Sequence, residues 1–259
     1  MTFWDWVVRL LQEYWPTFLR GAGTTLLLAV VGTIIGFLIG LLVAIVRTIP
    51  VSKSDSLLKR GVLKVLRGIF MVYIEVFRST PMMVQAMVIY YGVFASLSSD
   101  YVLWVGMFVI SINTGAYMSE IVRGGVISID PGQTEGAQSI GMTHWQTMVH
   151  VVLPQAIRNI LPSVGNEFVV NIKDSSVLSV ITVSEVFFAM RMAAGAYVRF
   201  FEASVIACVI YFVMTFTVTR ILRSIERRMD GPENYVIHGS QTVPAAELTV
   251  RQDLEGGEK

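Results

Sequence analysis

The chain has 259 residues, of which 54% are hydrophobic and only 15% are charged, and its mean hydropathy is +0.62. A soluble globular domain of this length carries more charge, so the composition places the chain among membrane proteins. The net charge of +1 lacks the basic excess that nucleic-acid binding requires, so we expect no nucleic-acid partner.

The N-terminal segment, residues 1–18, has no basic stretch followed by a short apolar core and a cleavage site, so it does not resemble a cleavable signal peptide. Its apolar residues share one helical face, as in a helix that lies in the outer membrane interface. An ordinary lead-in to the first membrane span explains the pattern equally well. The residues on this face are Trp4, Val7, Val8, Leu11 and Trp15.

Apolar segments predict an all-α membrane protein with about five transmembrane helices, in a membrane domain over residues 19–228. Residues 21–46 contain no charge and exceed the ~20 residues that a helix needs to cross a bilayer. Pro81 interrupts the second segment, so residues 69–77 and 82–97 are expected to form one broken helix. The remaining segments are 102–119, 151–189 and 200–219.

The basic residues are concentrated in two places, between the first two predicted spans and after the last one. Lysine and arginine accumulate on the cytoplasmic side of membrane proteins. With five spans, this places the N-terminus outside, and it places residues 123–150 and a flexible polar tail, 229–259, in the cytoplasm. The basic residues are Arg47, Lys53, Lys59, Arg60, Lys64 and Arg67, then Arg220, Arg223, Arg227 and Arg228.

Catalytic motifs are missing from the sequence. His144, His150 and His238 do not form HExxH or another spacing suited to a metal, and no phosphate-binding GxxxxGK[ST] loop occurs. We therefore expect neither an enzyme nor a cofactor or metal site. Any ATP that drives this protein must be bound by another chain.

Two features of the apolar segments have a structural interpretation. Gly32, Gly36 and Gly40 lie on one helical face and allow a second helix to approach closely, either within the bundle or, as an alternative, across a dimer seam. Cys208 lies within the last apolar segment, where we predict a packed thiol.

A polar insert interrupts the apolar pattern at residues 130–154. Asp130 and Pro131 form a helix start signal, and residues 133–142 are predicted to form a short helix. Gly141 permits a turn that a side chain would block. A second helical turn is expected to run into Leu153 and Pro154.

The insert resembles the EAA loop of ATP-binding-cassette (ABC) importer permeases. The matching residues are Glu135, Gly136 and Ala137, then Gly141 six positions after the glutamate, and Val151, Leu153 and Pro154. Gly136 departs from the usual alanine and should weaken the short helix by ~1 kcal/mol. The resemblance implies the type I importer permease fold, with coupling helices that dock onto a cytoplasmic ATPase.

Two further stretches resemble permeases for polar amino acids, "FRSTPMMVQ" at 77–85 and "LPSVGNEFVVNIKDSSVLSVI" at 161–181. The resemblance implies a permease in the cytoplasmic membrane of a prokaryote. Its implied partners are a cytoplasmic ABC ATPase dimer that binds ATP, a second permease subunit that is a copy or a paralogue, and an extracytoplasmic substrate-binding protein.

Other functions remain open from the sequence. An importer for an opine or a sulfur-containing amino acid would share the same loop. An ion-coupled secondary transporter would need no ATPase, but the inverted repeats typical of such proteins are not visible. A membrane hydrolase would need a nucleophile and a base at usable spacing, and the sequence offers none.

Ionisable residues inside the fourth segment predict a substrate site, because charges in a membrane are costly. Lys173 beside Asp174 offers both signs to the carboxylate and ammonium of an amino acid. Alternatively, these two residues neutralise each other and join two subunits. The full set of predicted substrate contacts is Glu167, Asn171, Lys173, Asp174 and Ser175, with Arg78, Thr80 and Gln85 near the break at Pro81.

Overall fold

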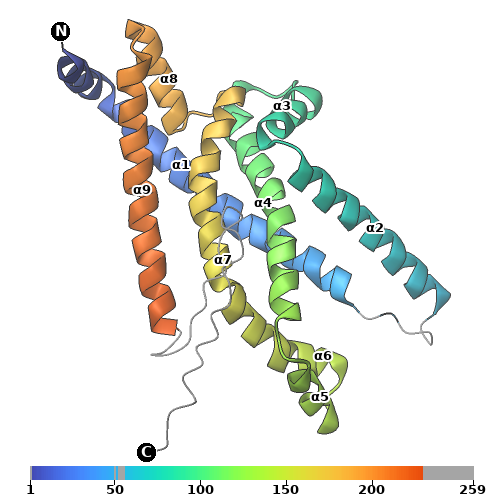
Figure 1. The fold of residues 1–259 in the computed structure, drawn as a ribbon. Helices are drawn as coiled ribbons and strands as arrows, with labels where there is room; N and C mark the ends of the chain where they lie inside the picture. The colour runs from blue at the N-terminus through green and yellow to red at the C-terminus, as the bar shows by residue number, and fades with distance from the viewer. Residues whose placement is uncertain (1, 50, 52–55, 230–259) are drawn as a thin grey trace, which may run out of the picture.

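A computed structural model describes residues 2–49, 51 and 56–229, and all secondary structure in these residues is helical (Figure 1). The all-α prediction is confirmed. The tail predicted at 229–259 lies outside the described residues from position 230 onward.

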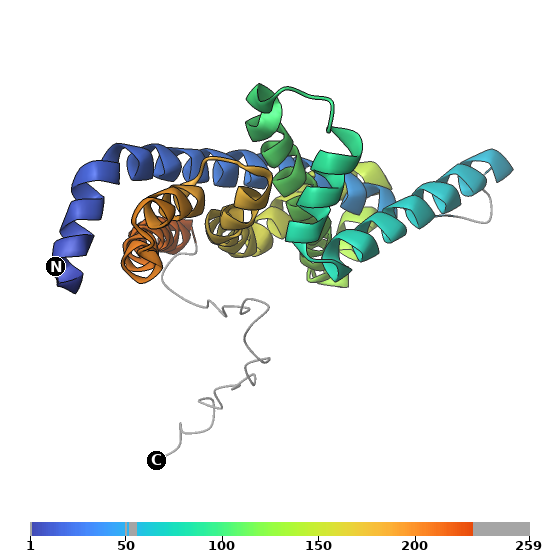
Figure 2. The same cartoon turned by 90° about the horizontal axis from the view of Figure 1, so that it is seen from above.

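Helix α1, Phe3–Thr48, is one continuous helix of 46 residues. Its first turn is capped by Thr2, whose side chain accepts a hydrogen bond from the Asp5 backbone while the Asp5 carboxylate accepts one from Thr2. Pro16 lies inside the helix, and α1 bends in its N-terminal part (Figure 2). The helix continues through residues 18 and 19, so no break marks the boundary predicted there.

The glycine row of α1 packs against α4, Val102–Ile127, which crosses it closely. A Cβ atom added to Gly36 would lie 2.8 Å from the Thr114 side chain, and one added to Gly40 would lie 2.5 Å from Met118 Cβ. Contacts this short leave room only for glycine. The interpretation of this row as packing within the bundle is confirmed.

The predicted broken helix consists of α2, Leu57–Ser79, and α3, Met82–Val93, which flank Thr80 and Pro81. Its N-terminal half extends away from the bundle (Figures 1 and 2). Proline removes a backbone donor and leaves carbonyl groups of the preceding turn without partners. The Gln85 amide compensates by donating to the carbonyls of Phe77 and Thr80, at 3.0 and 2.9 Å.

The polar insert folds as a helical loop at the end of the bundle opposite α3 and α8 (Figure 1). It contains α5, Pro131–Ser139, and α6, His144–Thr147, followed by a π-helical turn, Met148–Val152. The chain then returns to the bundle, and the last described element is a long helix. These elements are α7 (Leu153–Asp174), a 3-10 turn (Ser175–Ile181), α8 (Val186–Tyr197) and α9 (Phe200–Met229).

Three helical stretches among the described residues are long and apolar enough to cross a membrane: Phe3–Thr48, Val102–Ile127 and Phe200–Arg227. A bent pair, His144–Ile181 with Val186–Tyr197, supplies a fourth if the pair counts as one span. The α2–α3 pair corresponds to the second predicted segment, and α3 is too short to cross alone. The count of five crossings stays a prediction.

The thiol of Cys208 is exposed, so the prediction that it is packed was wrong for the isolated chain. Helix α9 buries only one face against the bundle, through residues such as Ala203, Ile206 and Ala207. Cys208 lies on the face that points away.

Candidate functional site

A cavity of about 370 Å³ lies where the break between α2 and α3 meets α4 and α7. It brings together five of the eight residues predicted as substrate contacts. These five are Thr80, Glu167, Asn171, Lys173 and Asp174. Pockets of this size accommodate small ligands when a few polar groups converge on them.

Both signs of charge face this cavity. Glu167 is buried, at 7% exposure, and Asp174 is half-buried, whereas Lys173 is exposed. In the described part of the chain, none of the three forms a salt bridge. The alternative that Lys173 and Asp174 neutralise each other therefore has no ion pair to support it within one chain.

Arg78 lies at the margin of the cavity. Its guanidinium lies 5.5 Å from the centre of the Tyr117 ring, and Tyr117 lines the cavity. Arg78 and Asp174 are both near enough to interact electrostatically with Glu167. A ligand in the cavity therefore meets Lys173 and the carboxyl groups of Glu167 and Asp174, with Arg78 outside the lining but close to it.

Gln85 and Ser175 were predicted to contact the substrate, but neither lines the cavity. Gln85 is buried, donates to Thr80 Oγ1 at 2.8 Å and accepts from the Asn113 amide at 2.8 Å, so it holds two lining residues in place. Ser175 is fully buried and donates to the Ile172 carbonyl. The turn that follows α7 directs Ser175 into the protein.

Asn171 lines the cavity, but its amide is already bonded to two other helices. Its oxygen accepts from Thr114 on α4 at 2.9 Å, and its nitrogen donates to Thr33 on α1 at 2.9 Å. The residue therefore joins α1, α4 and α7 below the cavity surface. Asn171 therefore holds the helices around the cavity in position.

Several residues that line the cavity were not predicted from the sequence. Asn113, Thr114 and Tyr117 come from α4, and Asn166 precedes Glu167 on α7. The pair Asn113–Thr114 inside an apolar helix was the available signal, because polar side chains at that depth need partners.

The N-terminus of α3 also faces the cavity, through Pro81 and Met82. Pro81 is its N-cap and no side chain caps this end. The first backbone N–H groups of a helix attract anions. This end of α3 can therefore receive a carboxylate.

The helical loop follows the predicted pattern, except that its first helix, α5, ends at Ser139 and does not extend to residue 142. Asp130 caps α5 by accepting from the Gly132 backbone at 2.7 Å, and Pro131 occupies the first turn. Gly141 has a φ of +86°, a conformation that glycine adopts without strain. Leu153 and Pro154 begin α7. The turn predicted at Gly141 is confirmed.

The loop presents both polar and apolar groups to its surroundings. Glu135 and Gly136 are exposed, whereas Ala137 is buried against the rest of the loop. Ile140 is 79% exposed and Trp145 is 69% exposed. Both large apolar side chains of this loop are therefore accessible to a partner.

Long apolar helices, a charged cavity and a projecting two-helix loop together suit an integral membrane transport component. Residues 56–231 match the family described as the inner membrane component of binding-protein-dependent transport systems. The chain belongs to this family.

Relatives of known function cover most of the chain. It is 35% identical to the glutamine transport system permease GlnP of Escherichia coli over 217 residues, 83% of this chain and 93% of that protein. It is 33% identical to the arginine transport system permease ArtQ of Bacillus subtilis, with the same coverage. A crystal structure of an amino acid ABC transporter with histidines matches with a TM-score of 0.73 and 37% identity, over 85% of this chain and 97% of that chain.

Proposed function

We propose that this chain is the transmembrane subunit of an ATP-driven importer for a polar or charged amino acid. The observation that carries this proposal is the cavity at the α2–α3 break, which gathers Lys173, Asp174 and Glu167 without an ion pair among them. Unpaired charges of both signs suit a zwitterion.

The substrate's two main-chain charges fit opposite parts of the cavity. The carboxylate is placed near Lys173 and the uncapped N-terminus of α3, an arrangement that discontinuous membrane helices offer to anionic groups. The ammonium is placed near Asp174. Thr80, which also lines the cavity, supplies a hydroxyl from the other side of the break.

Glu167 is placed to bind the substrate's side chain. A buried carboxylate favours a cationic or hydrogen-donating side chain. The relatives include one permease named for glutamine and one named for arginine, at nearly equal identity. Both side chains carry N–H donors, and Glu167 accepts from either.

The helical loop is assigned to coupling. The residues assigned to coupling are Glu135, Gly136, Ala137, Gly141, Leu153 and Pro154. The exposed side chains of Ile140 and Trp145 add apolar contacts. A cytoplasmic ATPase dimer binds this loop and hydrolyses ATP. A second permease subunit completes the pore, and an extracytoplasmic binding protein delivers the substrate in a prokaryotic cytoplasmic membrane.

Uptake by proteoliposomes tests the proposal. The permease is reconstituted with its ATPase and binding protein, and labelled glutamine and arginine are supplied outside with ATP inside. We expect uptake of at least one of the two only when both ATP and the ATPase are present. Uptake driven by an ion gradient without the ATPase would identify a secondary transporter instead.

A further inference from the structure

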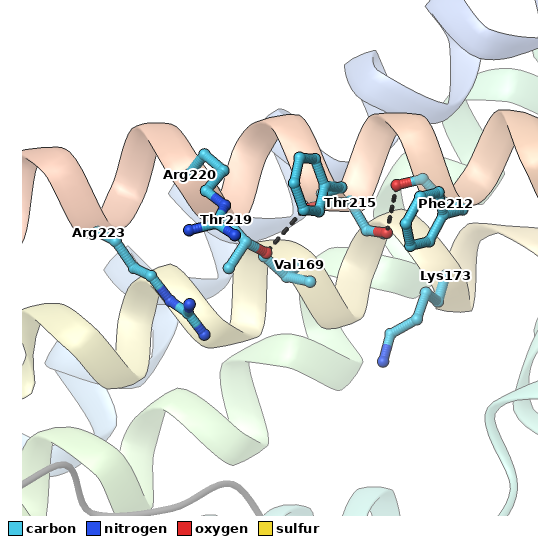
Figure 3. Close-up of a pocket in the computed structure, with 8 residues that line it drawn as sticks. Val169, Lys173, Phe212, Thr215, Thr219, Arg220 and Arg223 are labelled. Atoms are coloured by element: carbon cyan, nitrogen blue, oxygen red, sulfur yellow. Dashed lines mark hydrogen bonds between the residues drawn. The ribbon is translucent and has the colours of Figure 1, made fainter.

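A second hollow lies between α7 and α9, away from the break at Pro81, and shares only Lys173 with the cavity there. Its volume is about 380 Å³ (Figure 3). Phe212 and Phe216 on α9 form its apolar wall and are 62% and 48% exposed. Their rings stack with centres 5.6 Å apart. Arg220 and Arg223 follow on the same helix. We call this hollow the α7–α9 groove.

The charge of the groove has one sign. Its ionisable lining residues are Lys173, Arg220 and Arg223, and no carboxylate lines it. In the described part of the chain, neither arginine has an ion-pair partner, and the Arg220 guanidinium lies 4.9 Å from the centre of the Phe216 ring. The groove therefore attracts an anion.

The free hydrogen-bond donors of the groove come from Lys173 and the two arginines, and the arginines lie together at one end of it. Thr215 and Thr219 also line it, but each hydroxyl donates to a backbone carbonyl one turn earlier, at 2.8 and 2.7 Å. Each hydroxyl has only one proton, so neither threonine has a donor left for a ligand. Arginine binds phosphate oxygens through several N–H groups at once.

The arginines and phenylalanines of the groove lie at different levels along α9, as the phosphate and the acyl chains of a phospholipid do in a membrane. From Phe200 to Thr219, α9 contains no basic residue, and at 1.5 Å per residue this stretch spans roughly the ~30 Å of a hydrocarbon core. With this stretch placed across the hydrocarbon core, Arg220 is the first cation of α9 at the membrane boundary, while Phe212 and Phe216 lie within the core. A phospholipid places its phosphate and its acyl chains at these same two levels.

We infer that the α7–α9 groove binds an anionic phospholipid, with the headgroup phosphate at Arg220 and Arg223 and an acyl chain along Phe212 and Phe216. Free phosphate would leave the aromatic wall uncovered. A basic site at this boundary is typical of anionic lipid recognition. The inference does not depend on which substrate occupies the cavity.

Native mass spectrometry of the delipidated complex tests this site by titration with phosphatidylglycerol or phosphatidylcholine of equal chain length. We expect a preference for phosphatidylglycerol that falls roughly tenfold or more in the variant Arg220→Gln/Arg223→Gln. Arg227→Gln removes an exposed charge from the same helix outside the groove and should retain the preference. Equal affinity for the two lipids, or an equal loss in the control, overturns the inference.

Two further measurements separate the other occupants. Glycerol phosphate at millimolar concentration should not displace the lipid, and displacement would identify a plain phosphate site. The variant Thr219→Cys, in a Cys208→Ser background, should not cross-link two permease subunits. An efficient cross-link between subunits would show that a second copy covers the groove, and would overturn the assignment to lipid.

Discussion

The Asn171 side chain lies between two threonines from different helices, and its oxygen accepts a hydrogen bond of 2.9 Å from Thr114. The same amide donates to Thr33, so one buried residue on α7 fixes its distance to both α4 and α1. The Thr114 side chain also contacts the position of Gly36, one of the glycines at which α1 and α4 approach closely. The wall of the cavity and the helix crossing are therefore parts of one arrangement.

Replacing Asn171 with leucine should lower stability. The change leaves the hydroxyls of Thr114 and Thr33 without their partner, and each unsatisfied buried group costs about 1–3 kcal/mol. Thermal unfolding of the detergent-solubilised complex measures the effect. Asn166→Ala is the matched control, because Asn166 is exposed at the cavity and should leave the melting temperature nearly unchanged.

Gly40→Ala should also destabilise the protein, because its new Cβ atom would lie 2.5 Å from Met118 Cβ. Overpacking of this kind costs about 1–3 kcal/mol. Gly23→Ala lies on the same helix with nothing within 4 Å, so it should be neutral or stabilising by up to ~1 kcal/mol. Equal melting temperatures for the two variants would contradict the close crossing of α1 and α4.

The sequence predicts most of the fold because membrane helices have strong local signals. Apolar length located α1, α4 and α9, Pro81 located the break, and Gly141 located the turn of the loop. The burial of individual side chains depends on which face a helix turns to its neighbours. Cys208 was misplaced for this reason, since apolar residues occupy both the packed and the outer face of α9.

The site was predicted in part. Helical periodicity groups Glu167, Asn171, Asp174 and Ser175, and the first three line the cavity, whereas Ser175 is buried away from it. Periodicity cannot indicate which polar group already has a partner on another helix. The hydrogen bonds of Asn171 and Gln85 therefore required the structure, as did the contribution of α4 to the cavity.

The coupling loop is tested by substitutions at its two glycines. Gly141→Arg and Gly141→Ala should both impair coupling, because φ at this position is +86° and an L side chain is strained there. Gly141→Asn should retain more activity, since asparagine tolerates this region better. Gly136→Ala should preserve coupling and strengthen α5 by ~1 kcal/mol, as its Cβ meets open space.

Substrate-stimulated ATP hydrolysis in the reconstituted complex measures coupling, and co-purification measures attachment of the ATPase. If Gly141→Ala and Gly141→Arg both hydrolyse ATP like the parent, the loop does not transmit motion. A defect in Gly141→Arg alone would assign the effect to bulk and charge at the docking surface rather than to backbone strain.

The predicted orientation is tested by cysteine labelling in a Cys208→Ser background. A reagent that cannot cross membranes should label Ser98→Cys from outside, because residue 98 precedes α4 at the end opposite the loop. It should not reach Ser139→Cys on the loop until the membrane is opened. Both side chains are exposed, so burial does not limit labelling. Reversed accessibility would invert the topology and remove the cytoplasmic assignment of the loop.

Asp174→Asn separates a substrate contact from a structural role. If Asp174 holds the substrate's ammonium, the change removes one charge-assisted contact worth roughly 1.5–3 kcal/mol. Substrate affinity and transport should then fall at least tenfold, while basal ATP hydrolysis and the melting temperature stay near those of the parent. Glu75→Gln, which removes an exposed carboxylate from α2 outside the cavity, should change neither the substrate affinity nor the melting temperature.

A structural role for Asp174 predicts the opposite pattern, because Lys173 would then lose the neighbouring carboxylate that offsets its charge. The melting temperature would drop, and affinity per folded complex would be unchanged. Substrate binding and thermal unfolding measured on the same preparation decide between the two.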